Sequence, residues 1–438
     1  MINFKETTRF IKANISFHNL SEIGWVLSGQ IINVLLNFLI IKQLTRLGTE
    51  LYGVYALILT VNLLMGSLLY GPITQAFIRF YHENREAGRV SVYVKLMNNF
   101  VKYAALGMFG LGLVIILILT LSNLYSDYLI LSLAVIFIIT LKSNEFYSIS
   151  LNIIRKRKEN SLLQNMERII NLLLLWLLFN SSKDSLYTVL MIFGTTSILF
   201  FTIKYKLFSN FHLGYETKGE VNHLDVRNAI ISSLKIYAFP FIIWGITGWL
   251  QSNSEKWILA NYLSTADVGI YALMMTLVSA LIILPNNIIT EFSTPIIFQH
   301  FSDLSNHEKV NSGHKIINII VLVTVVFTAF ASAFTFFWGD EIILLISSEA
   351  FTLYSFLLPL FCIGTGLFYV GQAMCNTGMA LNVPQKYLLP KIIAGLLSVI
   401  LNIIFIINYG IIGVAYAMLA VGFLYSVHIM FINGKLKN

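Results

Sequence analysis

The chain has 438 residues, of which 57% are hydrophobic and 11% are charged, and its mean hydropathy is +0.77. A typical soluble domain carries about 25% charged residues. The composition therefore excludes a soluble globular protein, a disordered chain and a disulfide scaffold, and it predicts a polytopic membrane protein. The net charge of +8 is no evidence for a nucleic-acid partner until the positions of the charges are known.

Stretches free of charged residues predict the membrane spans, because a helix needs about 20 apolar residues to cross the hydrocarbon core. In chain order these stretches are 23–41, 51–78, 103–126, 185–203, 236–254, 268–290 and 316–339. The stretch 350–385 has room for a span and a loop, and 392–434 divides at a turn over 408–410. Two further predicted spans, 128–149 and 162–180, carry charges.

The apolar runs are continuous rather than alternating, which favours helices over a β-barrel as the spanning structure. The predicted fold class is therefore an all-α polytopic membrane protein with about twelve transmembrane helices. Lys and Arg give its orientation: with the N-terminus inside, 22 of them fall on the inner side and 4 on the outer side. The inner set includes Lys204, Lys386 and Lys391, which this count assigns to loops. Both termini are predicted to be cytoplasmic.

The chain contains an internal repeat. Residues 47–57 align with residues 263–273, and six of the eleven positions are identical. The offset of 216 residues is about half the chain, which predicts two halves of six spans each with the same orientation. The expected domains are an N-terminal cytoplasmic or interfacial segment, an N-lobe, a cytoplasmic loop and a C-lobe, with the bounds 1–22, 23–207, 208–231 and 232–438.

Several of these segments resemble a known family. The segments 44–57 and 76–80, and then Phe239-Pro240, 254–259 and 268–272, are similar to segments of O-antigen and capsule repeat-unit flippases of the Wzx type. That family belongs to the multidrug/oligosaccharidyl-lipid/polysaccharide (MOP) exporter superfamily. One departure is Glu255-Lys256, where the family often has Asp-Arg or Asp-Lys, but the charge pattern is the same.

The resemblance implies two six-helix lobes that form a V around a cation-lined cavity in the bacterial cytoplasmic membrane. It implies transport of an undecaprenyl-diphosphate-linked oligosaccharide to the outer leaflet by alternating access. The expected partners are this substrate, membrane lipid, and the polysaccharide polymerase and chain-length machinery. No cofactor, metal or nucleic acid is expected, and coupling to protons or sodium ions is left open.

A charged, hydroxyl-rich headgroup cannot be desolvated in hydrocarbon at a tolerable cost, so cations within the spans are the substrate-binding candidates. They are Lys142, Lys235 and Arg168, and Arg79 joins them as a candidate for substrate capture at the cytoplasmic mouth. Lys142 has Glu145 on the same helical face, three residues on. The alternatives for Lys142 are a neutralised pair or a side chain that reaches back to the cytoplasmic surface.

The candidate charge partners or coupling residues are Glu145, Glu167 and Glu291. Six residues on the predicted outer side are candidates for an outer gate: Lys42, Arg46, Glu50, Glu255, Lys256 and Asp267. The three cations among them break the positive-inside rule, so each requires a functional reason. Salt bridges that close an outer gate are slightly favoured over direct contacts with the diphosphate. Trp244 and Tyr237 are further candidates, as stacking platforms for a sugar.

The sequence contains no catalytic constellation, no nucleotide-binding fingerprint and no histidines with metal-ligand spacing. Two other functions compete with the flippase. A cation-coupled drug or solute antiporter of the same superfamily is disfavoured because the deep charges include more bases than acids. A membrane glycosyltransferase or polymerase is disfavoured by the short outer loops and by the half-chain repeat.

Overall fold

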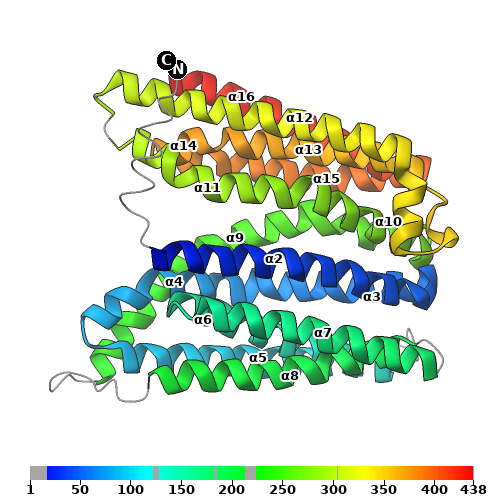
Figure 1. The fold of residues 1–438 in the computed structure, drawn as a ribbon, viewed down its shortest axis with the longest axis horizontal. Helices are drawn as coiled ribbons and strands as arrows, with labels where there is room; N and C mark the ends of the chain where they lie inside the picture. Colours follow the sequence, from blue (N-terminus) through cyan, green and yellow to red (C-terminus); the bar gives the residue numbers. More distant parts are fainter. Residues whose placement is uncertain (1–16, 122–127, 182–184, 213–222, 303, 438) are drawn as a thin grey trace. The chain divides into compact units, whose positions relative to one another are not determined.

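The computed structural model describes residues 17–121, 128–181, 185–212, 223–302 and 304–437. Every regular element in these ranges is a helix (Figure 1). Eleven helical segments of the described chain are long and apolar enough to cross a membrane. The predicted all-α membrane fold is therefore confirmed.

The first of these segments, 28–86, is 59 residues long. At 1.5 Å per residue it would measure about 90 Å, roughly three times the thickness of the hydrocarbon core. A short 3₁₀ turn, η1 (Thr45–Leu47), divides it into α2 (Phe17–Leu44) and the helices that follow. Counted as two crossings, the segment brings the number of spans to the twelve that the sequence predicts.

The second crossing consists of α3 (Gly48–Met65), the π-helical turn η2 (Gly66–Tyr70) and α4 (Gly71–Glu86). The other helices of the first half are α5 (Val90–Leu121), α6 (Tyr128–Ile153), α7 (Arg157–Ser181) and α8 (Leu186–Phe211). In the second half, α9 (His223–Tyr262) is followed by α10 (Thr265–Val278), the π-helical turn η3 (Ser279–Ile283), α11 (Leu284–His300) and α12 (His307–Ile346).

The chain ends with short 3₁₀ elements and four more helices. These are η4 (Glu349–Phe351), η5 (Ser355–Leu357), α13 (Leu358–Met374), α14 (Asn376–Ala380), η6 (Pro384–Tyr387), α15 (Leu388–Tyr409) and α16 (Ile412–Lys437). The predicted turn over 408–410 is present: α15 ends at Tyr409, and Gly410 has φ +60°, a conformation that favours glycine. Helix α12 extends beyond the predicted span 316–339, because it continues to Ile346 past a non-helical residue, Trp338.

The two halves share an irregularity that the sequence analysis did not predict. Both π-helical turns are followed by a proline in the first turn of the next helix, Pro72 in α4 and Pro285 in α11. Proline lacks the backbone N–H and crowds the preceding turn, and a π-helical turn absorbs this disruption without ending the helix. The matching position of the two turns is independent support for the internal repeat.

The chain forms two compact units. The first consists of the described parts of 1–44 and 68–241, and the second of 45–67 and the described parts of 242–438. These units differ from the expected lobes in two respects. Segment 45–67 belongs with the second unit, and the boundary falls inside α9, next to Pro240, rather than in the loop predicted at 208–231. Much of that loop is helical, since α8 continues to Phe211 and α9 begins at His223.

The two copies of the repeat pack against each other inside the second unit, where α3 contacts α10. A Cβ atom on Gly53 would lie 1.8 Å from the carbonyl oxygen of Thr265, and one on Gly269 would lie 2.0 Å from that of Thr49. Neither position can carry a side chain at this separation, because both obstacles are backbone atoms. Small residues that allow close backbone approach are a common basis of helix packing in membranes.

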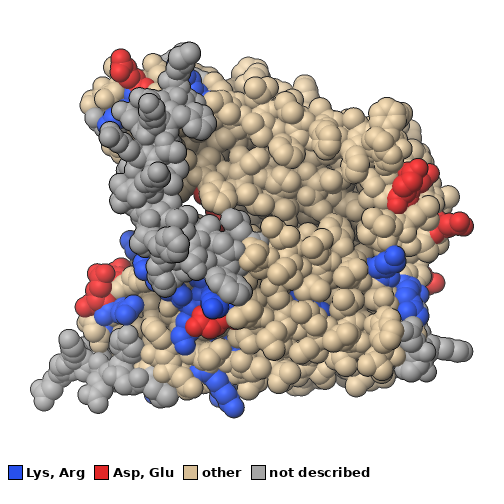
Figure 2. Space-filling model, viewed as in Figure 1, with Lys and Arg blue, Asp and Glu red and all other residues tan. Residues whose placement is uncertain are grey.

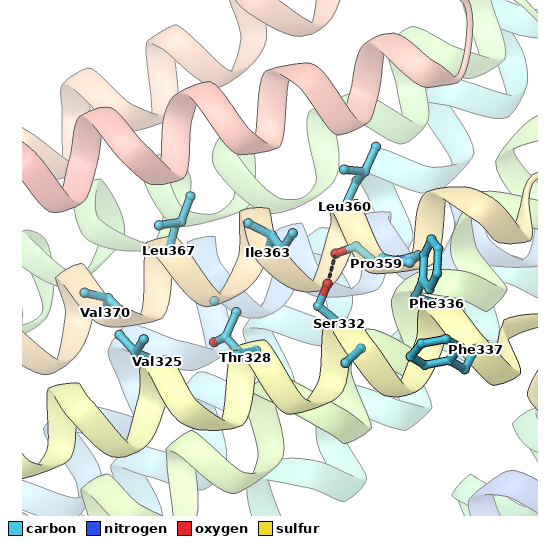
Figure 3. Close-up of a pocket in the computed structure, with 13 residues that line it drawn as sticks. Val325, Thr328, Ser332, Phe336, Phe337, Pro359, Leu360, Ile363, Leu367 and Val370 are labelled. Carbon is cyan, nitrogen blue, oxygen red and sulfur yellow. Dashed lines mark hydrogen bonds between the residues drawn. The ribbon is translucent and has the colours of Figure 1, made fainter.

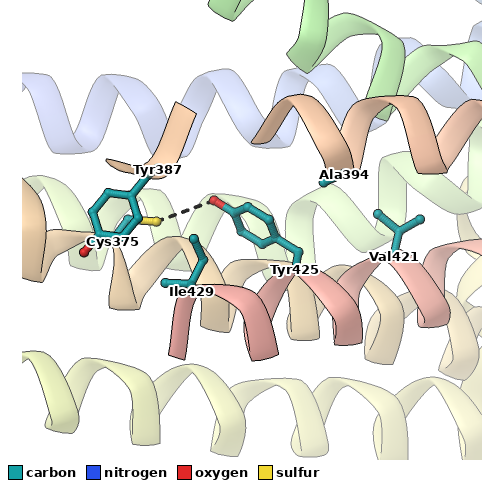
Figure 4. Close-up of a cluster of buried hydrophobic side chains, with 6 residues drawn as sticks. All are labelled: Cys375, Tyr387, Ala394, Val421, Tyr425 and Ile429. Atoms are coloured by element: carbon teal, nitrogen blue, oxygen red, sulfur yellow. Dashed lines mark hydrogen bonds between the residues drawn. The ribbon is translucent and has the colours of Figure 1, made fainter. Parts of the chain in front are cut away.

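On the face shown in Figure 2, charged side chains lie mainly toward the ends of the helices, and uncharged residues cover most of the middle. This distribution suits helices surrounded by hydrocarbon. In the second unit, a buried cluster joins the C-terminal elements through Cys375, Tyr387, Ala394, Val421, Tyr425 and Ile429 (Figure 4). The Cys375 thiol and the Tyr425 hydroxyl are 3.5 Å apart within this cluster.

Candidate functional site

The predicted pair on α6 is present. The Nζ atom of Lys142 lies 2.6 Å from Oε2 of Glu145. The Lys142 side chain is only 7% exposed, whereas that of Glu145 is 48% exposed. The pair forms because residues three apart on a helix share a face. It neutralises Lys142 in this structure, so an anionic ligand would have to displace the Glu145 carboxylate to reach the ammonium.

A second buried lysine, Lys204, was assigned to a loop by the charge count, and that assignment is wrong. Lys204 lies in α8 and is only 1% exposed. Its ammonium donates hydrogen bonds to Asn144 Oδ1 and Ser148 Oγ, both at 2.8 Å, and lies 3.5 Å from Glu167 Oε2. The count failed because α8 continues seven residues beyond Lys204, and Phe208 in that part of the helix packs against Tyr147 of α6.

Glu167 is the acidic member of this cluster. Asn144 donates to both of its carboxylate oxygens, at 2.8 and 2.9 Å, and Ser197 donates to Oε1 at 3.4 Å. Each charge therefore has several partners from neighbouring helices. Such a satisfied network stabilises the packing of α6, α7 and α8 and leaves neither charge available for a ligand. The role of Glu167 in coupling stays a prediction.

Arg168 is half-buried on α7, and its guanidinium lies 3.5 Å from Asn37 Oδ1 on α2. Neighbouring residues on a helix point in different directions, so Arg168 and Glu167 have different surroundings. Arg79 on α4 and Lys235 on α9 are both exposed. The guanidinium of Arg79 lies 5.5 Å from the ring centre of Phe80, which in turn contacts the ring of Tyr237. Arg79 and Lys235 therefore sit on accessible surface of the first unit.

The six candidates for an outer gate have different surroundings. Glu255 and Lys256 form an ion pair at 3.9 Å in α9, where Tyr271 also donates to Glu255 at 3.2 Å. Asp267 lies in the first turn of α10, where its backbone N–H donates to the hydroxyl of the N-cap residue Ser264 at 3.1 Å. The remaining three are exposed near the turn between α2 and α3: Lys42, Arg46 and Glu50. A gate composed of all six stays a prediction.

The coupling candidate Glu291 is exposed on α11. Among the described residues, no group of three or more His, Cys, Asp or Glu side chains has the arrangement of a metal site. Both cysteines, Cys362 and Cys375, are buried free thiols.

The charge count also placed Lys391 in a loop, and this too is corrected by the structure. Lys391 is a half-buried residue of α15, and its Nζ atom lies 4.2 Å from the ring centre of Trp244. Trp244 is a candidate from the sequence, but Lys391 is not. A pairing across 147 residues leaves no trace in local spacing, so the partner could not have been found from the sequence.

An apolar groove of about 680 Å³ lies between α12 and α13 of the second unit (Figure 3). Figure 3 shows Val325, Phe336 and Leu367 among its lining residues, and the hydroxyl of Ser332 is bonded to the Pro359 carbonyl at 3.2 Å. The groove has no charged lining residue. Its chemistry suits a hydrocarbon chain rather than a charged headgroup.

Comparisons with known proteins agree with this architecture. The family model described as polysaccharide biosynthesis protein matches residues 20–301. No curated protein matches the chain significantly. Among solved structures, the chain is similar to the lipid II flippase MurJ in an inward closed conformation, with a TM-score of 0.65 and 17% identity over 96% of this chain and 88% of that one.

Two transporters show the same likeness. A multidrug resistance MATE family transporter of the MOP superfamily, in an inward-facing conformation, matches with a TM-score of 0.63 and 14% identity over 92% of this chain and 94% of that one. The MATE transporter VcmN of Vibrio cholerae matches with a TM-score of 0.62 and 14% identity over 95% and 97%. At these identities the likeness shows that the chain shares the fold of these transporters.

Proposed function

Because the chain belongs to the polysaccharide biosynthesis protein family, we propose that it is a flippase for undecaprenyl-diphosphate-linked oligosaccharide repeat units. It moves them from the cytoplasmic to the outer leaflet of the bacterial cytoplasmic membrane, where they are assembled into a surface polysaccharide such as O-antigen or capsule. Both termini then face the cytoplasm, in keeping with the positive-inside bias.

The observation that carries this proposal is the coincidence of two findings on one chain. The polysaccharide family model covers nearly two thirds of the sequence, and the whole chain has the fold of a lipid II flippase. Lipid II flippase and polysaccharide biosynthesis point to the same kind of cargo, a sugar attached to a lipid. A multi-pass protein of this fold offers what such a cargo requires, which is polar and cationic side chains within helices surrounded by lipid.

The cations of the chain support an anionic cargo. Arg79 and Lys235 are exposed on the first unit, and Lys142 holds a carboxylate that an anion could replace. The diphosphate would exchange with such carboxylates in an alternating-access cycle. The polymerase and chain-length machinery would then remove the product on the outer side, and coupling to protons or sodium ions would supply any further driving force.

A cation-coupled drug or solute antiporter is the alternative, since MATE transporters share the fold. A cationic drug requires acidic residues that can receive it. The most buried acids of the described chain, Glu167 and Glu255, already hold lysines, which disfavours this alternative. We do not propose an enzymatic activity, because the family is one of polysaccharide biosynthesis proteins and the fold neighbours are a flippase and transporters.

The test is a deletion strain, complemented with the intact gene, in which surface polysaccharide and undecaprenyl-linked intermediates are measured by mass spectrometry. We expect loss of the polymer and accumulation of complete repeat units on the inner leaflet. Unchanged polymer together with altered drug susceptibility would instead support the antiporter.

A further inference from the structure

The lysines of the membrane-spanning helices differ in what neutralises them. Lys142, Lys204 and Lys256 each have a carboxylate within 4 Å, at 2.6, 3.5 and 3.9 Å respectively. Lys391 is also enclosed in a span, 384–409, but it has no ion pair or hydrogen bond among the described residues. Its contact is the ring of Trp244, at 4.2 Å.

The surroundings of Lys391 do not supply a negative charge. Gly248, one turn after Trp244 on α9, lies beside the lysine, since a Cβ there would be in ordinary contact with Lys391 Cε at 4.0 Å. The titratable group that interacts electrostatically with Lys391 is Cys375, a buried thiol that contacts the Tyr425 hydroxyl. Within the described part of the chain, Lys391 thus has no counterion.

An ammonium inside a membrane span is costly unless an anion or a dipole compensates it, so an ionisable residue there points to a ligand. The aromatic face of Trp244 compensates part of the charge through its quadrupole, and it can also stack against the apolar face of a sugar. A cation beside an aromatic ring is therefore suited to a ligand in which a phosphate adjoins a sugar.

We propose that Lys391 and Trp244 form a phosphate-binding subsite of the second unit, with Lys391 contacting a phosphate of the lipid-linked substrate and Trp244 packing against the adjoining sugar. This proposal rests on the flippase function proposed above. Lys391 is the fourth residue of α15, near the end of the helix that the orientation rule places at the cytoplasmic side. The subsite would thus capture the headgroup where the substrate is made.

The experiment measures binding of undecaprenyl phosphate to the purified full-length protein in detergent, for the wild type and three variants. Lys391→Gln should weaken binding about tenfold or more, because one charge-assisted contact is lost. Lys391→Arg should retain it. Lys386→Gln is the matched control, since Lys386 is exposed on η6 only five residues away, and it should bind like the wild type.

Two further ligands identify what is recognised. Undecaprenol, which has the same tail without phosphate, should bind weakly and equally to all four proteins. Competition by inorganic pyrophosphate would indicate that the subsite also binds free phosphates, whereas failure to compete would restrict it to the lipid headgroup. Both results support a phosphate-binding subsite. Equal binding of undecaprenol and undecaprenyl phosphate to the wild type would overturn it.

A measurement on the unaltered protein covers the case in which Lys391→Gln does not fold. Undecaprenyl phosphate should protect Lys391, but not Lys386, from an amine-acetylating reagent, as read by peptide mass spectrometry. Absence of protection, or wild-type affinity in Lys391→Gln, refutes the subsite. The deletion strain tests the flippase function separately, so a flippase with an unimportant Lys391 is distinguished from a protein that is not a flippase.

Discussion

Replacing Gly269 by alanine tests the close packing of the two repeat copies. The new Cβ would lie 2.0 Å from the Thr49 carbonyl oxygen and 3.1 Å from the Gly53 nitrogen. An ordinary carbon–oxygen contact is about 3.3 Å or longer, so α3 and α10 must separate locally by about 1 Å. Overpacking of this kind costs about 3 kcal/mol when the obstacle is rigid backbone. Alanine regains about 1 kcal/mol of helix propensity, which leaves a net loss of about 2 kcal/mol.

The assay is unfolding of the purified protein in detergent, with Gly110→Ala as the matched control. Gly110 lies in the interior of α5, and its Cβ would have no heavy atom within 4 Å. Gly110→Ala should therefore be neutral or stabilise the protein by up to about 1 kcal/mol. Gly53→Ala should behave like Gly269→Ala, because its Cβ would meet the Thr265 carbonyl oxygen at 1.8 Å. Wild-type stability in Gly269→Ala would refute the argument that this contact requires glycine.

Three further predictions concern buried charges. Lys204→Ala should lower the free energy of unfolding by about 3 kcal/mol, because it leaves Glu167 buried without its cation. The double variant Lys204→Met with Glu167→Gln should recover most of this loss. Wild-type stability in Lys204→Ala would contradict the argument. Lys142→Ala should reduce polysaccharide export with little effect on stability or membrane insertion, because Glu145 is half exposed; normal export at matched expression would remove Lys142 from the site. Burial lowers the pKa of His212, so the unfolded chain binds protons more readily than the folded one, and stability should fall as the pH drops below about 6.5. His212→Gln should flatten this pH dependence of stability in thermal unfolding. An unchanged slope would argue against a contribution from His212.

Local patterns in the sequence were sufficient for much of the fold. Apolar runs of sufficient length predicted the spans, and the turn at Gly410 followed from its neighbouring residues. The pair of Lys142 and Glu145 was also predictable, because residues three apart on a helix meet whatever the tertiary structure. These features depend on one segment at a time, and the sequence contains all the information they require.

The partners of Lys204 and Lys391 depend on more than one segment. Lys204 contacts residues 37 and 60 positions earlier in the chain, and Lys391 contacts a residue 147 positions earlier. A count of charges treats a lysine at the end of an apolar run as a loop residue, although the helix continues beyond it. Only the packing of helices distinguishes a lysine that has a carboxylate and hydrogen-bond partners, as Lys204 does, from one whose contact is an aromatic ring, as for Lys391.

The contact between Gly53 and Gly269 also constrains how the two halves can diverge. At each glycine, the absence of a side chain leaves room for the backbone of the other copy. A larger residue at one position cannot be offset by a smaller one at the other, since glycine is already the smallest. Substitution of either glycine is therefore blocked by the other copy, and this accounts for the glycine that residues 47–57 and 263–273 share. Random mutagenesis followed by selection for folded protein should find these two positions among the least variable of the chain.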